Sequence, residues 1–135
     1  MDNDGDLDIL VTHQFAPLSI YRNDLTSNEQ NWLGLTLEGN GKTCNRDAVG
    51  TRVELCIKNA NGEFNSQFRE VTASNGFSAQ GDPRLLFGFG SANDSDGNPE
   101  TGEMEILINW CGDVNPQRLL LASGVYHHIR QESDQ

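Results

Sequence analysis

Apolar and polar residues alternate at every second position along most of this chain, and no stretch has the spacing of an amphipathic helix. Gly, Asn, Asp and Pro residues separate the alternating stretches. Short connections favour antiparallel pairing, because a parallel crossover needs a dozen or more residues. We therefore predict an all-β fold, an antiparallel sandwich or a barrel-like domain of eight or nine short strands. The strands are expected at Leu7–Thr12, Ser19–Asn23, Trp32–Leu37, Gly50–Lys58, Phe68–Ala73, Leu85–Phe89, Met104–Trp110, Leu119–Leu121 and Val125–Ile129.

The alternation also predicts which side chains form the core. Leu33, Leu35 and Leu37 share one face of their strand. A single register places a second set on the inner faces of the later strands. Leu7–Thr12 is expected to be a short buried strand in a hairpin with Ser19–Asn23. The inward set is Val53, Leu55, Ile57, Val71, Ile106, Ile108 and Trp110.

A polar stretch from Asp24 to Asn31 resembles a linker. It divides the chain into an N-terminal unit, residues 1–30, and a main domain, residues 31–135. The Asn61-Gly62 pair within the main domain is a strong signal for a β-hairpin turn.

Charge and composition exclude several classes of partner. Twenty Asp and Glu residues against nine Lys and Arg give a net charge of −11. Nucleic acids and anionic membrane surfaces both require clustered basic residues, which this chain lacks. No apolar run reaches the roughly 18 residues of a membrane span, so no membrane insertion is expected. The acidic N-terminus does not resemble a signal peptide, so we expect no export signal in the chain itself.

The three cysteines, Cys44, Cys56 and Cys111, contain no Cys-x-x-Cys pair. Neither a zinc site nor a disulfide framework is indicated. One bridge with one free thiol and three reduced thiols both fit the sequence.

The acidic N-terminus carries the sharpest motif of the chain, Asp2-Asn3-Asp4-Gly5-Asp6-Leu7-Asp8. Alternating oxygen donors around a glycine are how a short loop surrounds a hard cation. We predict a calcium loop, although a solvated, frayed acidic tail would have a similar composition. The expected ligands are Asp2, Asp4, Asp6 and Asp8.

The stretch Asp2–Thr12 resembles the calcium loop and following strand of FG-GAP/VCBS repeats, the units of integrin-like β-propellers. In that family a further Asp normally lies two residues before the position of Asp2. This chain is therefore expected to begin inside a repeat, as a fragment of a larger calcium-repeat protein. The missing ligand should weaken calcium binding.

The main domain contains four stretches that form a recognisable set of motifs: Asn45-Arg46-Asp47-Ala48-Val49-Gly50-Thr51-Arg52-Val53, Arg69-Glu70-Val71, Gly76-Phe77-Ser78-Ala79-Gln80 and Phe87-Gly88-Phe89-Gly90. In these motifs the domain resembles the ASPIC/UnbV domain of cartilage acidic protein-like proteins. Two positions depart from the family pattern: Leu86 stands where a His is common, and Trp110-Cys111-Gly112 replaces Trp-Pro-Ser-Gly. The resemblance implies a secreted, non-catalytic binding or adhesion module whose ligand is a protein or a polysaccharide.

Four polar residues of these motifs, Arg46, Asp47, Arg69 and Gln80, are candidates for a ligand-binding site at one edge of the sheet. Polar residues at sheet edges also serve pairing and solubility, which is the plainer interpretation. The alternative function is a carbohydrate hydrolase or lyase that uses paired carboxylates such as Asp47 and Glu70. The chain has no Gly-x-Ser-x-Gly motif, and we favour a protein that is not an enzyme.

The N-terminal hairpin should also determine the oligomeric state. In a propeller such a hairpin is flanked by other strands, whereas residues 1–23 would expose unpaired edges and an apolar face. We therefore predict a homodimer in which this hairpin contributes to the interface.

Overall fold

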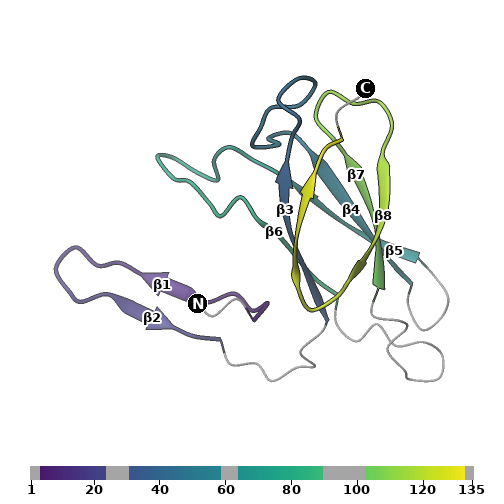
Figure 1. Ribbon diagram of the computed structural model, residues 1–135. Helices are drawn as coiled ribbons and strands as arrows, with labels where there is room; N and C mark the ends of the chain where they lie inside the picture. The colour runs from purple at the N-terminus through teal and green to yellow at the C-terminus, as the bar shows by residue number, and fades with distance from the viewer. Residues whose placement is uncertain (1–3, 24–30, 59–63, 90–102, 133–135) are drawn as a thin grey trace, which may run out of the picture.

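The computed structural model describes residues 4–23, 31–58, 64–89 and 103–132, which form nine β-strands (Figure 1). This confirms the predicted all-β class. Within these ranges no helix is long and apolar enough to cross a membrane. The strands are β1 (Ile9–Val11), β2 (Ser19–Tyr21), β3 (Trp32–Glu38), β4 (Arg52–Lys58), β5 (Phe64–Glu70), β6 (Leu85–Gly88), β7 (Glu103–Asn109), β8 (Gln117–Ala122) and β9 (Tyr126–Arg130).

Most strands lie within one or two residues of their predicted bounds, and β5 is the exception. The sequence predicts a strand at Phe68–Ala73, but β5 begins at Phe64 and ends at Glu70. Its register with β4 pairs Lys58 with Phe64 and Arg52 with Glu70, so the two strands form a hairpin. The first half of β5 is polar, and its alternation is therefore weak. The Asn61-Gly62 turn itself lies outside the described residues, as does most of the predicted linker.

The described strands form three sheets: a two-stranded β1-β2 sheet, a three-stranded β6-β3-β9 sheet and a four-stranded β5-β4-β7-β8 sheet. All neighbouring strands are antiparallel except β3 and β9, which run parallel with Gly34 opposite Tyr126. The expectation of a wholly antiparallel domain is wrong at this one pair. Short connections constrain only consecutive strands, and five strands separate β3 from β9 in the sequence.

The two larger sheets enclose one apolar core and form an open sandwich, with no closed barrel among the described strands (Figure 1). Leu33 and Phe87 from the three-stranded sheet and Leu55 and Ile106 from the four-stranded sheet are completely buried. The predicted inward set is confirmed. Its members Val53, Leu55, Val71, Ile106, Ile108 and Trp110 are buried, and Ile57 packs against them half-buried.

The β1-β2 hairpin extends away from the sandwich (Figure 1). Leu10 pairs with Ile20, and the side chains of both are largely exposed. The prediction of a buried strand at Leu7–Thr12 is therefore wrong. A two-stranded sheet has two faces, and no second layer among the described strands covers either face of this hairpin.

Candidate functional site

Residues 39–51 connect β3 to β4, and the side chain of Asn40 orders the start of this connection. Oδ1 of Asn40 accepts hydrogen bonds from three successive backbone amides, at 2.8, 3.0 and 3.3 Å, those of Lys42, Thr43 and Cys44. Asparagine suits this role because its short amide reaches backbone N–H groups just ahead of it. The Gly- and Asn-rich stretch is thus an ordered turn. We call residues 39–51 the pinned loop.

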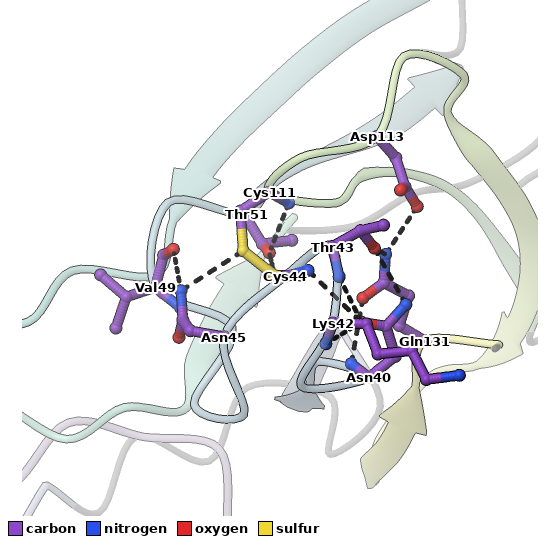
Figure 2. Close-up of a disulfide and its surroundings, with 10 residues drawn as sticks. All are labelled: Asn40, Lys42, Thr43, Cys44, Asn45, Val49, Thr51, Cys111, Asp113 and Gln131. Atoms are coloured by element: carbon purple, nitrogen blue, oxygen red, sulfur yellow. Dashed lines mark hydrogen bonds between the residues drawn. A yellow bond between two sulfur atoms is a disulfide. The ribbon is translucent and has the colours of Figure 1, made fainter. Parts of the chain in front are cut away.

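The pinned loop is joined covalently to the end of β7. Cys44 forms a disulfide with Cys111, 67 positions later, and their Cα atoms are 4.9 Å apart (Figure 2). Beside the bridge, the buried hydroxyl of Thr51 accepts a hydrogen bond from the backbone amide of Cys111 at 3.2 Å. Cys56 is a free thiol. Of the two cysteine states that the sequence leaves open, the structure contains one bridge and one free thiol.

A buried glutamine after the last strand ties three segments together. The Oε1 atom of Gln131 accepts a hydrogen bond from the backbone amide of Asn40 at 3.0 Å. Its Nε2 atom donates to Asp113 Oδ2 at 2.6 Å and to Thr43 Oγ1 at 3.2 Å (Figure 2). Because a buried amide without partners is costly, these bonds hold the loop, the β7–β8 connection and the chain after β9 in one arrangement.

The second half of the pinned loop is a tight turn closed by Asn45. Its side chain accepts from the amide of Val49 at 2.9 Å and donates to the carbonyl of the same residue at 2.8 Å. Ala48 adopts a φ of 53° and is completely buried. This turn leaves Arg46 and Asp47 exposed. Their side chains form no hydrogen bond or ion pair with any described residue, so they are available to a ligand.

The four predicted ligand-binding residues are all exposed, but they lie in three separate places. Arg46 and Asp47 belong to the pinned loop, Arg69 to the end of β5, and Gln80 to the connection between β5 and β6. Among the described residues, no hydrogen bond or ion pair joins any two of them. The structure therefore groups only Arg46 and Asp47.

Arg69 contributes to packing at the open side of the sandwich. It is opposite Val53 in the β4–β5 register, and its guanidinium carbon lies 5.4 Å from the ring centroid of Phe87. Two residues earlier, Gln67 donates a hydrogen bond to the carbonyl of Gly88 at 2.7 Å. These contacts join β5 of one sheet to β6 of the other, where no backbone ladder connects them.

The carboxylate pair considered for hydrolysis is not enclosed. Asp47 is exposed in the pinned loop, and Glu70 is exposed at the end of β5. Glu70 accepts a hydrogen bond from Arg52 at 3.0 Å, in an ion pair whose two side chains are largely in water. A general acid of a glycosidase normally lies in a less polar environment that keeps it protonated.

We call residues 2–8 the acidic loop, and the structure describes it from Asp4 onward. Oδ1 of Asp4 accepts a hydrogen bond from the backbone amide of Asp6 at 3.0 Å, and Asp8 Oδ1 accepts one from the amide of Asn23 at 2.9 Å. Asp2 lies outside the described residues. In the described part of the chain, no three His, Cys, Asp or Glu side chains converge on a point that could hold a metal ion.

The acidic loop contacts the sandwich through an aromatic pair. Trp32 begins β3 and lies next to Tyr126 of β9, with ring centroids 5.0 Å apart. The ring of Tyr126 in turn lies 4.7 Å from the guanidinium carbon of Arg84. Nη2 of Arg84 donates a hydrogen bond to Oδ2 of Asp82 at 2.6 Å, and hydrogen bonding from this side chain lowers the pKa of the Asp82 carboxyl. Gly5 of the acidic loop packs on the indole of Trp32.

Sequence reasoning missed Gln131, the partner choice of Cys44, and the Trp32–Tyr126 pair. Each depends on strands that are distant in sequence, so no local spacing could reveal it. The only available signal was the outward position that alternation assigns to Trp32 and Tyr126, opposite the core-facing leucines of β3. Aromatic side chains gain much free energy from burial, so rings at such positions commonly pack against each other or against another segment.

Residues 41–97 match the profile of the family described as ASPIC and UnbV. The matched range includes most of the pinned loop, the β4-β5 hairpin and β6. Comparisons with curated proteins and with solved structures found no match.

Proposed function

With residues 41–97 matching the ASPIC and UnbV family, we propose that this chain is a non-catalytic binding module of an extracellular calcium-repeat protein. Its contact surface is the pinned loop. The ligand is a protein or a polysaccharide that meets the exposed charges of this loop.

One observation carries the proposal: the pinned loop has a fixed backbone, and its charged side chains have no ion-pair partners among the described residues. A disulfide, two asparagine turns and Gln131 hold its main chain. The side chains of Lys42, Arg46 and Asp47 nevertheless remain exposed, without ion-pair partners among the described residues. A surface that is ordered before binding loses little conformational entropy on association. Mixed charges on such a surface give specificity for a complementary ligand.

The extracellular assignment is supported by the same loop. Disulfides form and persist in oxidising compartments and are rare in the cytosol. The Cys44–Cys111 bridge joins two segments of one domain, and its sulfur atoms lie at the edge of the core rather than in an open active site. This is the arrangement of a structural bridge, which suits a secreted protein.

The proposed calcium site is the acidic loop, held by Asp4, Asp6 and Asp8 together with Asp2. Two features fit a hard cation: the alternating carboxylates and a glycine with a φ of +99° at the centre of the loop. The described carboxylates do not converge on one point, so a calcium ion would have to draw them together. Calcium would then stabilise the loop rather than take part in a reaction.

The N-terminal hairpin is proposed to derive from an FG-GAP/VCBS repeat and to form a homodimer contact. Ile9, Leu10, Ile20 and Tyr21 are 45–61% exposed, an unusual density of apolar surface for so short a segment. Burial of this surface contributes about 25 cal/mol per Å². Repulsion between two chains of charge −11 is screened beyond about 10 Å at 0.1 M salt and should be the weaker effect.

The test combines a glycan array with a panel of immobilised extracellular-matrix proteins, both probed with the intact chain. We expect binding that is lost in the double variant Arg46→Ala/Asp47→Ala. The matched control is Arg52→Ala/Glu70→Ala, which removes one exposed charge of each sign from the β4-β5 hairpin and should bind normally.

A turnover screen with the same polysaccharides addresses the alternative. If the wild type cleaves a polysaccharide and both Asp47→Asn and Glu70→Gln abolish the cleavage, the chain is a hydrolase or lyase and not a non-catalytic binding module. Equal loss of binding in the Arg46/Asp47 variant and in its control would mean that the pinned loop is not the contact surface.

A further inference from the structure

The connection between β5 and β6, residues 71–84, carries the most exposed large apolar side chain of the described residues. That side chain is Phe77, which is 101% exposed. We call this connection the arm, and Figure 1 shows it, in teal, extending away from both sheets. A single exposed apolar side chain is common on protein surfaces. The construction of the arm around this ring is what distinguishes it.

Contacts between its own two sides order the arm. The hydroxyl of Thr72 donates a hydrogen bond to Oδ1 of Asn75 at 2.6 Å. The amide of Asn75 also lies against the returning backbone at Gly81, where an added Cβ atom would come within 2.1 Å of Nδ2. Asn75 therefore joins the outgoing and the returning side of the arm.

A tight turn displays Phe77 at the tip of the arm. Gly76 and Ala79 form a β-bridge, so that only Phe77 and Ser78 lie between the two bridged positions. Ser78 adopts a φ of 51°, a backbone region that residues other than glycine seldom occupy. Because the turn already has a defined backbone, little conformational entropy is lost when the ring binds.

The arm begins where the pinned loop ends. The amide of Gly50 donates to the carbonyl of Val71 at 2.9 Å, and the amide of Val71 donates to the carbonyl of Thr51 at 2.9 Å. The side chain of Val71 is buried in the core, which fixes this junction. The arm is thus continuous with the surface proposed above to contact the ligand.

The side chains that surround the ring are uncharged. Residues 72–81 contain no Asp, Glu, Lys, Arg or His, in a chain whose net charge is −11. Ser74, Asn75, Ser78 and Gln80 supply hydroxyl and amide groups instead. Antibody paratopes have a similar composition, in which aromatic rings supply contact area and small polar side chains supply adaptable hydrogen bonds.

A protruding ring selects among the possible classes of partner. The ring is best covered by a concave apolar pocket, and a folded protein offers such a pocket whereas a polysaccharide chain does not. A bilayer would also accept the ring. A single apolar side chain attaches weakly to a bilayer, however, and residues 72–81 lack the basic residues that strengthen attachment to anionic lipids.

We propose that Phe77 is the anchor of a protein–protein contact and that its partner is a protein with an apolar pocket and an uncharged rim. The inference rests on the proposed binding module and narrows its ligand from a protein or a polysaccharide to a protein. Aromatic residues are enriched in the core of such interfaces. A few anchors enclosed in pockets carry most of the binding energy, while the polar contacts around them exclude water.

The experiment measures the affinity of the intact chain for the panel of immobilised extracellular-matrix proteins, for the glycan array and for phosphatidylcholine vesicles. Phe77→Ser should weaken binding to a protein of the panel at least tenfold, because no ring fills the pocket. Phe77→Leu keeps an apolar side chain and should retain part of that affinity. Val114→Ser is the matched control, since Val114 is 95% exposed in the β7–β8 connection, and it should bind like the wild type.

The stability of the variants provides a check on folding. Neither Phe77 nor Val114 is buried, so urea unfolding of the three variants should match that of the wild type. Equal loss of binding in Phe77→Ser and in Val114→Ser would overturn the anchor.

The outcomes separate this inference from the proposed function. If Arg46→Ala/Asp47→Ala loses binding and Phe77→Ser does not, the anchor is wrong and the pinned loop remains the contact surface. The reverse result would keep the anchor and overturn the pinned loop. Wild-type binding to glycans alone, or to vesicles in a manner that Phe77→Ser abolishes, would overturn the choice of a protein partner. No binding of the wild type to any of the three probes would overturn both proposals.

Discussion

Gly34 and Tyr126 are opposite each other in the parallel pair of β3 and β9, and the tyrosine ring lies directly on the glycine. A Cβ atom on Gly34 would come within 2.1 Å of Cδ1, 2.3 Å of Cε1 and 2.7 Å of Cγ of that ring. The ring covers the strand where a side chain is missing. It also brings Tyr126 next to Trp32 and thereby shapes the surface on which the acidic loop docks.

Gly34→Ala should destabilise the protein by about 1–3 kcal/mol, because the whole ring of Tyr126, including its Cγ atom, must shift to accommodate the methyl group. Gly88→Ala is the control: it lies on the neighbouring strand with no atom within 4 Å of the added Cβ, and its effect should stay within about 0.5 kcal/mol. Urea unfolding measures both. Equal effects would show that the close approach at Gly34 does not matter.

Leu55→Ala should cost about 2–5 kcal/mol, since Leu55 is completely buried between the sheets and truncation leaves a cavity. Leu120→Ala makes the same chemical change at a largely exposed position of β8 and should cost less than about 0.5 kcal/mol. Denaturant unfolding compares the two. A small effect at Leu55 would contradict the register of β4.

The disulfide predicts a specific thiol count. Without reductant the denatured chain should react as one thiol, that of Cys56, and after reduction as three. Cys44→Ser/Cys111→Ser should lower the free energy of unfolding by about 2–5 kcal/mol, because the bridge closes a long loop. Cys56→Ser is the control and should change stability little. Three reactive thiols before reduction would contradict the bridge.

Light scattering at micromolar concentration should give twice the chain mass of 14.9 kDa. Leu10→Lys/Ile20→Lys places two charges on one opposed pair of the hairpin and should yield a monomer. Val114→Lys, at an exposed position in the β7–β8 connection, should leave the dimer intact. A wild-type monomer would rule out dimerisation through the hairpin.

The Asp82–Arg84 pair predicts a small acid-dependent effect. Hydrogen bonding from the Arg84 side chain lowers the pKa of Asp82, so the folded state takes up the proton less readily than the unfolded chain. The stabilisation is complete above the ordinary Asp pKa of about 4 and is lost as the pH falls through the lowered value. Both groups are partly exposed, so the contribution is below about 1 kcal/mol. Asp82→Asn should remove this part of the acid dependence of unfolding.

The alternation of apolar and polar residues was sufficient to predict the strands that have one buried face. It predicted β3, β4 and β7 and the inward side of each, because every second residue there is a large apolar one. It misplaced β5, whose first half carries Asn65, Ser66 and Gln67 at a sheet edge. It also overestimated the burial of β1, because an apolar strand has the same composition whether or not another layer covers it.

The candidate site could be predicted only in part. The acidic loop and the Arg46-Asp47 turn are local motifs, and the sequence indicates both. The partner of Cys44 lies 67 positions away, and Gln131 reaches Asn40 across 91 positions. Long-range pairs of this kind depend on the order of strands in the sheets, which local residue spacing does not determine.

The parallel pairing of β3 and β9 has a consequence for how the chain acquires its structure. Glu38 of β3 and Arg130 of β9 are 92 positions apart, yet they are neighbours in the finished sheet. During synthesis on the ribosome, β3 has its antiparallel neighbour β6 long before β9 has emerged. Contacts of such high sequence separation form slowly, and an exposed strand edge is prone to aggregation in the meantime. The edge of β3 is therefore the place where a chaperone would protect a nascent chain.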